Sequence, residues 1–406
     1  MWRPRLEVAD VFRAQDESFW GALEPRLSSE QRRVVGAISA CRTAALGGHV
    51  DAYGPCGHLA VSYNSCRDRH CPKCQGAERE RWLAERTKDL LPVAYFHVVF
   101  TVPEQVAEIA LRNKREVYAI LFKAASDALR IVAADPRHLG AEVGVLAVLH
   151  TWGQTLVHHP HLHCVIPGGG LSPGGAWVGC RETFLLPVRV LSRVFRRRFL
   201  EELEAARARG ELAWVGRIGR LALAGEWRRL LATLRRVEWV VYAKRPFGGP
   251  EQVLEYLGRY THKVAITNAR LLSHEGGRVR FRYRDYRAGD AERVLELEAG
   301  EFIRRFLQHV LPRGFQRLRQ YGLLANRGRR EKLERARREL ERRGAGAEPP
   351  RVGPSGDAGE EAEPGARGQC PVCGEGRRVS RRELARGEEV EPLVAAAREP
   401  ARTDSS

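Results

Sequence analysis

The chain has 406 residues, 43% of them hydrophobic, and a formal net charge of +18. This length allows two or three domains with at least one sizeable hydrophobic core. The sequence has no run of the roughly 18 apolar residues that a membrane helix requires, and its first residues lack the apolar segment of a signal peptide. We therefore expect a cytoplasmic protein that does not interact with membranes.

The positive charge is concentrated in the first 325 residues. Residues 326–406 contain 18 basic and 16 acidic side chains, a contribution of +2, which leaves +16 for residues 1–325. Residues 187–236 alone contain 13 basic and 5 acidic side chains, among them the consecutive Arg196, Arg197 and Arg198. This distribution favours a polyanionic partner, with nucleic acid the leading candidate, over a merely solvated basic helix face.

The order of the expected elements favours an α+β fold with an antiparallel sheet. A helical start and a loop-rich, cysteine-bearing segment precede an amphipathic helix over residues 76–91. Strand-like runs then follow without the regular strand-helix-strand order of a parallel sheet. The expected strands cover residues 93–102, 143–152, 161–166, 237–247 and a hairpin within 264–286, and the expected helices cover residues 113–134, 191–209, 251–265 and 299–310.

Three regions follow from these patterns. Residues 1–90 form a helical lead-in and a zinc-binding domain, whose zinc segment covers about residues 41–76, and residues 91–325 form the main α+β domain. Residues 326–406 begin with a charged helix, and the Pro-, Gly- and Glu-rich segment after it is predicted to be largely disordered.

Cysteine spacing predicts a structural zinc site near the N-terminus. Five of the nine cysteines lie between residues 41 and 74, and a C-x2-C pair supplies two thiolates at one turn. The predicted ligands, in a C-x9-C-x4-C-x2-C array, are Cys56, Cys66, Cys71 and Cys74. Cys41 is interpreted as a helix-packing thiol, and the reserve donors are His49, His58 and His70. A second pair, Cys370 and Cys373, is either half of a zinc site completed by another chain or inert.

A histidine cluster opens the segment "HHPHLHCVIPGGG" at residues 158–170. In an extended strand His161 and His163 project to the same side, where two imidazoles can hold a divalent ion and leave positions open for a phosphate. Surface or satisfied core histidines are the alternative interpretation, and His158 is assigned a structural role. Gln154, on an antiparallel neighbour, or His159, on the same strand face, is the candidate third ligand.

A second group lies in "EYLGRYTHK". Tyr256 and Tyr260 are four residues apart, so both hydroxyls lie on one face of a helix. Arg259 and Lys263 are cations suited to phosphate oxygens, and a tyrosine can attack phosphorus to form a covalent phosphotyrosine. Tyrosine pairs at this spacing are more often packing residues.

Together these segments resemble the two-tyrosine HUH transposases of the insertion sequence 91 family. The similar segments are the cysteine segment at residues 41–75, "HPHLHCVIPGGG" and "YLGRYTHKVAITNARL", in the same order. One departure is that Tyr53 in "YGPCG" stands where the family usually has its first zinc-segment cysteine.

The resemblance implies an HUH nuclease core, an antiparallel sheet carrying the histidines with the tyrosine helix packed across it. It makes His161 and His163 ligands of a catalytic Mg²⁺ or Mn²⁺, and Tyr256 and Tyr260 the nucleophiles. The implied activity is cleavage of single-stranded DNA at element ends, giving a 5′-phosphotyrosine and a free 3′-hydroxyl, followed by strand transfer in rolling-circle transposition. The basic helix with Arg196, Arg197 and Arg198, and aromatics such as Trp177, could follow the strand.

Two other functions remain open from the sequence. A plasmid replication initiator or relaxase would share the chemistry. A non-enzymatic zinc protein would bind DNA through its basic surface without cutting it. The sequence does not indicate an oligomeric state.

Overall fold

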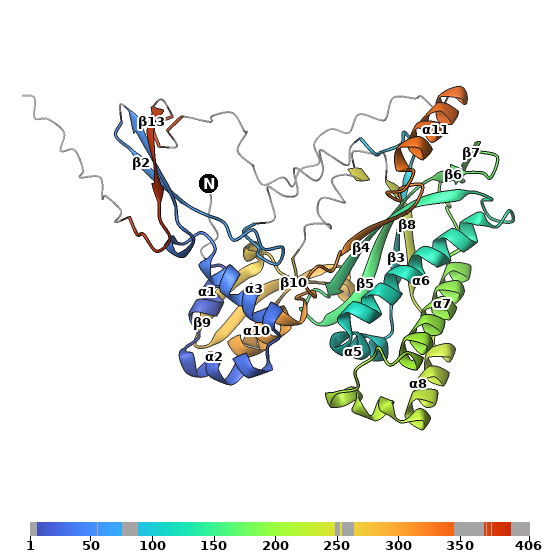
Figure 1. Cartoon of the computed structure of the whole chain (residues 1–406), viewed down its shortest axis with the longest axis horizontal. Helices are drawn as coiled ribbons and strands as arrows, with labels where there is room; N and C mark the ends of the chain where they lie inside the picture. Colours follow the sequence, from blue (N-terminus) through green and yellow to red (C-terminus); the bar gives the residue numbers. More distant parts are fainter. Residues whose placement is uncertain are drawn as a thin grey trace, which may run out of the picture.

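The computed structural model describes residues 6–54, 56–74, 88–247, 252–253, 264–344, 369–370, 372–374 and 376–390. Its largest sheet has seven strands in the order β7-β6-β4-β5-β3-β8, and β12 also pairs with β4. All of these pairs are antiparallel, so the predicted α+β class is confirmed (Figure 1). The strands are β3 (Tyr95–Thr101), β4 (Glu142–Trp152), β5 (His158–Pro167), β6 (Gly169–Leu171), β7 (Trp177–Gly179), β8 (Val241–Phe247) and β12 (Leu318–Gly322).

Four helices cover one face of this sheet. Alternate residues of β5, namely Leu162, Cys164 and Ile166, belong to the same buried apolar core as the inner sides of these helices. Because side chains alternate along a strand, the residues between them face the other side. The helices are α5 (Glu104–Arg112), α6 (Lys114–Ala134), α7 (Val188–Ala208) and α8 (Ala224–Arg236), and Figure 1 shows α6 and α7 lying across the sheet.

A second core joins the start of the chain to residues 265–310. Helix α10 (Ala299–Gln308) buries Phe302, Ile303, Phe306 and Leu307, the three- and four-residue spacing of one helix face. These side chains share a core with the N-terminal Val8 and Phe12, so apolar packing crosses the boundary predicted at residue 90. The other elements here are α1 (Val8–Arg13), α2 (Glu17–Leu23), α3 (Ser29–Ala40) and the sheet of β9 (Leu271–Glu275), β10 (Arg278–Asp285) and β11 (Ala291–Glu298).

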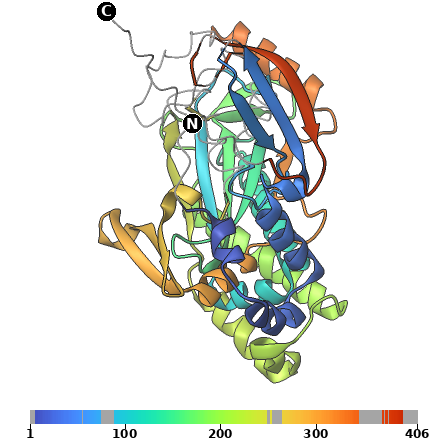
Figure 2. The ribbon, with the colours of Figure 1, turned by 90° about the vertical axis from the view of Figure 1, so that its left-hand side faces the viewer.

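A third, small sheet contains part of the C-terminal region. Its order is β13-β1-β2, with β1 (Gly48–Gly54) in the centre between β2 (Leu59–Tyr63) and β13 (Arg377–Leu384). Figure 2 shows β13 beside β1 although some 330 residues separate them in the chain. The predicted charged helix is present as α11 (Arg329–Arg342), and part of the segment after it, which was expected to be largely disordered, forms β13.

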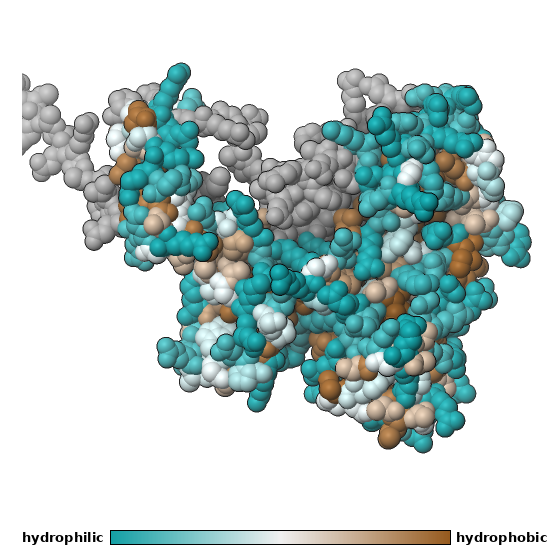
Figure 3. All heavy atoms as spheres, in the orientation of Figure 1, coloured by the Kyte–Doolittle hydropathy of each residue, from teal (hydrophilic) through white to brown (hydrophobic). Residues whose placement is uncertain are grey.

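Several predicted features lie outside the described residues. These are most of the helix expected at residues 76–91 and nearly all of the helix expected at 251–265. Among the described helices, none combines the length and apolarity needed to cross a bilayer. On the face seen in Figure 3 the described surface is largely hydrophilic, with scattered apolar side chains, as is normal for a folded chain in water.

Candidate metal centres and nucleic-acid interface

Three histidines meet on the face of the large sheet that α6 and α7 leave uncovered. His161 and His163 project from β5, and His150 lies directly opposite His161 on β4. One ring nitrogen of each lies within 4.8 Å of those of the other two. The antiparallel pairing therefore brings together three imidazoles that can bind one ion.

Hydrogen bonds orient two of these rings. Nδ1 of His161 lies 2.7 Å from the carbonyl oxygen of His159, so Nδ1 carries the proton and donates, and Nε2 is left as the ligand atom. Nδ1 of His163 lies 2.8 Å from Nε2 of His97, a buried residue of β3. Burial lowers the pKa of His161 to about 4, so this imidazole is neutral at pH 7, the form that binds metals.

The third member of the cluster differs from both predicted candidates. Gln154 lies after the end of β4, and its amide nitrogen donates to the Tyr286 hydroxyl at 2.9 Å. The ring of His159 is exposed. His150 takes this place because Trp152 pairs with His158 across the hairpin, with a bulge after His150. The sequence shows both strands but not this register, which sets "VLH" at residues 148–150 against "HLH" at residues 161–163.

His158 and His97 support the cluster without belonging to it. Nε2 of His158 lies 2.8 Å from the Tyr118 hydroxyl, on the helix-covered side of the sheet, as its predicted structural role requires. His97, which sequence reasoning missed, lies nearly parallel to His163 and meets it edge to edge through the hydrogen bond between them, with ring centroids 5.0 Å apart.

A cleft of about 840 Å³ opens beside the three histidines. Its walls include Arg270 and the end of β10, and Tyr286, the residue after β10, is 68% exposed. Tyr242 of β8, 51% exposed, lies on the same cleft. Exposed aromatic rings and arginines beside a metal-binding cluster suit a nucleic-acid strand, because bases stack on rings and cations contact phosphates.

The predicted nucleophiles belong to the tyrosine segment. Tyr256, Tyr260, Arg259 and Lys263 all lie outside the described residues. Their roles therefore stay predictions.

The predicted basic helix, α7, packs on the helix-covered face of the sheet, and the histidine cluster lies on the other face. Arg198 of α7 pairs with Asp127 of α6 at 3.1 Å, and Arg196 donates to the Val237 carbonyl at 2.9 Å. Arg197 is exposed but also projects from α7, beyond the sheet. Trp177, proposed to stack on DNA, is 3% exposed and belongs to a buried core.

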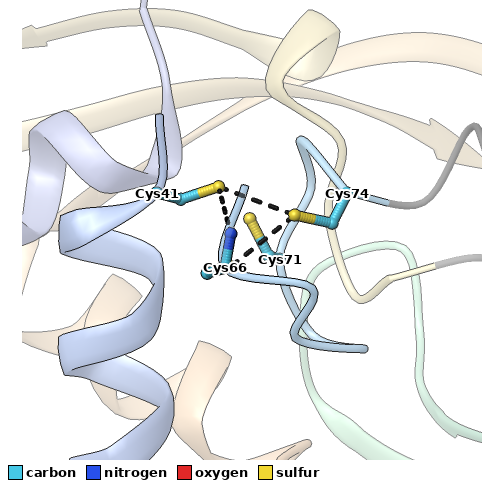
Figure 4. Close-up of side chains that lie close together, drawn as sticks. All are labelled: Cys41, Cys66, Cys71 and Cys74. Atoms are coloured by element: carbon cyan, nitrogen blue, oxygen red, sulfur yellow. Dashed lines mark hydrogen bonds between the residues drawn. The ribbon is translucent and has the colours of Figure 1, made fainter. Parts of the chain in front are cut away.

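Four cysteine sulfurs converge beside the end of α3 (Figure 4). They belong to Cys41, Cys66, Cys71 and Cys74, and lie within 4.8 Å of one another. Sulfurs bound to one zinc ion at about 2.3 Å and tetrahedral angles lie about 3.8 Å apart. The Cys74 sulfur lies 3.5 Å from that of Cys41 and 3.6 Å from that of Cys66. The four thiols therefore fit a tetrahedral zinc site.

This set corrects the predicted ligands. Cys41, interpreted as a packing thiol, takes the place given to Cys56, which lies near Cys370 and Cys373 instead. Cys41 directly follows α3, and its side chain points toward the other three cysteines. The reserve donor His70 has another contact, because its Nδ1 pairs with Asp68 at 2.9 Å and its Nε2 accepts from the Leu311 amide at 3.2 Å.

Comparisons with known proteins agree with this arrangement. Residues 11–102 match a family model described as "Transposase zinc-binding domain", and residues 144–332 match one described as "Putative transposase". The chain is 54% identical over 383 residues to "Putative transposase y4qJ" of Sinorhizobium fredii, covering 94% of this chain and 96% of that protein. It is 29% identical over 294 residues to "Transposase for insertion sequence element IS801" of Pseudomonas savastanoi pv. phaseolicola, covering 71% and 68%. No solved structure matches significantly.

Proposed function

The chain belongs to the insertion sequence 91 family of transposases, and from this premise we propose that it cleaves and rejoins single-stranded DNA at the ends of a mobile element. The observation that carries the proposal is the cluster of His150, His161 and His163 on an open cleft. A sheet face with a metal-binding cluster and an adjoining cleft is what a phosphate-cutting site needs, because the scissile phosphate must reach the ion.

The imidazoles of His150, His161 and His163 would hold the catalytic ion. Nitrogen donors suit Mn²⁺ better than Mg²⁺, which prefers oxygen ligands, so we propose Mn²⁺ as the better of the two expected ions. A bound divalent ion supplies Lewis-acid polarisation of the scissile phosphate. The contribution of the chain is to fix the ring positions through the His159 carbonyl and His97.

The proposed covalent step uses Tyr256 or Tyr260. The phenol oxygen attacks the scissile phosphorus, and the bond from phosphorus to the 3′ oxygen breaks. The phenol proton passes to solvent, and the leaving oxygen takes up a proton to become a 3′-hydroxyl. The 5′-phosphotyrosine keeps the energy of the broken ester, so the reverse attack by a 3′-hydroxyl can join strands without a nucleotide cofactor. Two tyrosines allow two strand ends to be held in succession.

The cleft supports a single-stranded substrate. Tyr286 and Tyr242 both line it and are exposed, and unpaired bases stack on such rings without sequence preference. The bases of a duplex are already stacked in pairs and would not offer these faces. Arg270, whose guanidinium donates to the Gln154 carbonyl, brings positive charge to the same cleft.

A covalent-adduct assay tests the proposal. The full chain is incubated with a labelled single-stranded oligonucleotide of the element end and Mn²⁺, and protein-linked label is measured after denaturation. We expect an adduct that chelator prevents and that the double variant Tyr256→Phe, Tyr260→Phe abolishes. The matched control is Tyr242→Phe with Tyr286→Phe, which removes the hydroxyls of the two exposed cleft tyrosines and should leave the adduct.

The outcomes separate the alternatives. An adduct that persists without Tyr256 and Tyr260 would contradict the nucleophile assignment. Salt-sensitive DNA binding without any metal-dependent adduct would instead indicate a non-enzymatic zinc-containing DNA-binding protein. A replication initiator would form the same adduct, so joining of two element ends in the same reaction is the further result that a transposase must give.

A further inference from the structure

We infer that Cys56, Cys370 and Cys373 form a second zinc site, which attaches the C-terminal segment to the N-terminal sheet. Their sulfur atoms lie within 4.8 Å of one another, and those of Cys56 and Cys370 are 3.5 Å apart. This separation is close to the roughly 3.8 Å between two thiolates on one tetrahedral zinc ion. Two of the three cysteines lie outside residues 11–102, which match the zinc-binding family model. The inference does not depend on the proposed DNA cleavage.

The backbone around the C-x2-C pair is folded as a metal-binding turn. The Gly374 amide donates to the Cys370 carbonyl at 3.0 Å, and the Cys370 amide donates to the Gly376 carbonyl at 2.6 Å. The Gly376 amide donates to the Cys373 sulfur at 3.3 Å. An amide that donates to sulfur favours the thiolate, which is the form that binds zinc. The turn therefore presents both sulfurs on one side.

Glycine at position 376 permits the approach to Cys56. A Cβ atom there would lie 2.8 Å from the Gly54 carbonyl oxygen and 3.2 Å from the Cys56 sulfur. A residue larger than glycine at position 376 would push the turn away from the end of β1. The close contact thus brings together cysteines that are 314 residues apart in the chain.

The small sheet has little apolar burial to hold β13 in place. Of the eight residues of β13, only Leu384 is buried, and the other seven are exposed. Besides its backbone pairing with β1, β13 makes the ion pair of Arg381 with Asp51, at 2.7 and 2.9 Å. An edge strand with one buried side chain is marginal in water, and small folds with little core commonly depend on a metal or disulfide cross-link. The three cysteines lie at the end of β13 opposite Leu384, where a cross-link would complete the attachment.

Three thiolates leave one tetrahedral position for a further ligand. His58, two residues after Cys56, is half-buried and stacks on Tyr53 with ring centroids 6.2 Å apart. Its ring nitrogens are not part of the three-sulfur group. The fourth position is therefore open to water, or to His58 after a change of side-chain rotamer.

Zinc stoichiometry of the reduced full chain tests the inference. We expect two zinc ions per chain by elemental analysis, and one in the double variant Cys370→Ser, Cys373→Ser. Cys56→Ser should likewise retain one. The matched control is Cys180→Ser, a half-buried cysteine whose sulfur contacts the Arg181 carbonyl instead, and it should retain two. One zinc in the wild-type chain would overturn the inference, as would two in the double variant.

A second measurement tests the attachment itself. A protease site is introduced between residues 345 and 368, and the cut chain is passed over a sizing column. In the presence of zinc we expect the C-terminal fragment to stay bound to the N-terminal fragment. It should separate after zinc is chelated, or in the Cys370→Ser, Cys373→Ser variant. A fragment that stays bound in that variant would show that strand pairing suffices. Release only by a reducing agent would identify a disulfide in place of a metal site. Either result overturns the inference.

Discussion

The contact between His97 and His163 gives a sharp test of how the histidine cluster is held. His97 is 1% exposed, and its Nε2 lies 2.8 Å from Nδ1 of His163. In His97→Phe an aromatic ring is kept at this position while the hydrogen bond to His163 is lost. A buried N–H left without its acceptor costs about 1–3 kcal/mol. Loss of such a supporting contact lowers metal affinity by about 10- to 100-fold.

The assay is a titration with Mn²⁺, followed by electron paramagnetic resonance of the free ion. We expect Mn²⁺ binding by His97→Phe to weaken within that range, and His163→Ala to lose it. His309→Phe is the matched control, because His309 is another buried histidine whose ring contacts Thr151 and the Leu156 carbonyl, outside the cluster. If the Mn²⁺ affinity of His97→Phe is within about twofold of the wild-type affinity while His163→Ala does not bind Mn²⁺, the hydrogen bond from His97 does not support metal binding, and the prediction is refuted.

Three other results follow from the structure. Tyr286→Ala should weaken binding of single-stranded DNA by about 1–3 kcal/mol through loss of base stacking; Tyr286→Phe should not, and equal losses in fluorescence-anisotropy titrations would contradict a stacking role. Arg197 lies on α7, on the other side of the sheet from the cleft, and its ion pair with Glu201 is exposed. Arg197→Ala should therefore change adduct formation by less than about twofold, because exposed ion pairs contribute little. A large loss would indicate that the DNA contacts α7. Hydrogen bonds from Arg304, at 2.6 and 2.8 Å, and from Arg305 lower the pKa of Glu301 to about 2. A carboxyl group whose pKa is lower in the folded than in the unfolded state stabilises the fold at pH values above its unfolded-state pKa. This stabilisation is lost as the pH falls through the folded-state pKa. Glu301→Gln should therefore lower the free energy of unfolding by about 1 kcal/mol at pH 7, after allowance for its partial exposure, and by less as the pH falls from about 4.5 toward 2. A cost that is the same at pH 7 and pH 3 in denaturant titrations would contradict this.

Local patterns predicted the features that depend on neighbouring residues. The alternation in "HLHCVI" placed His161 and His163 on one face, and the apolar run before Trp152 indicated the strand that pairs with it. The C-x2-C spacing placed Cys71 and Cys74 in one site. Each of these follows from a strand period of two or from a single turn, so no knowledge of distant parts of the chain is needed.

Features that depend on tertiary packing were not predictable in this way. The choice of His150 over Gln154 depends on the hairpin register and on the bulge after His150, which sequence alternation does not specify. Cys41 reaches the zinc cluster because of where α3 packs, and Cys56 leaves it because a strand from the far end of the chain pairs with β1. Both cysteine errors came from grouping residues by their proximity in sequence.

The first cysteine cluster is mechanically connected to the histidine strand, although the two do not touch. The zinc loop contacts the segment after α10, where Arg69 donates to the Phe315 and Pro312 carbonyls at 2.6 and 3.1 Å. That segment leads directly into β12, which pairs with β4 from Val148 to Gly144. Strand β4 carries His150, two residues beyond this pairing. Arg69 reaches these carbonyls with its side chain, so we expect an ordered zinc loop to limit movement of β12 and, through the strand pairing, of β4.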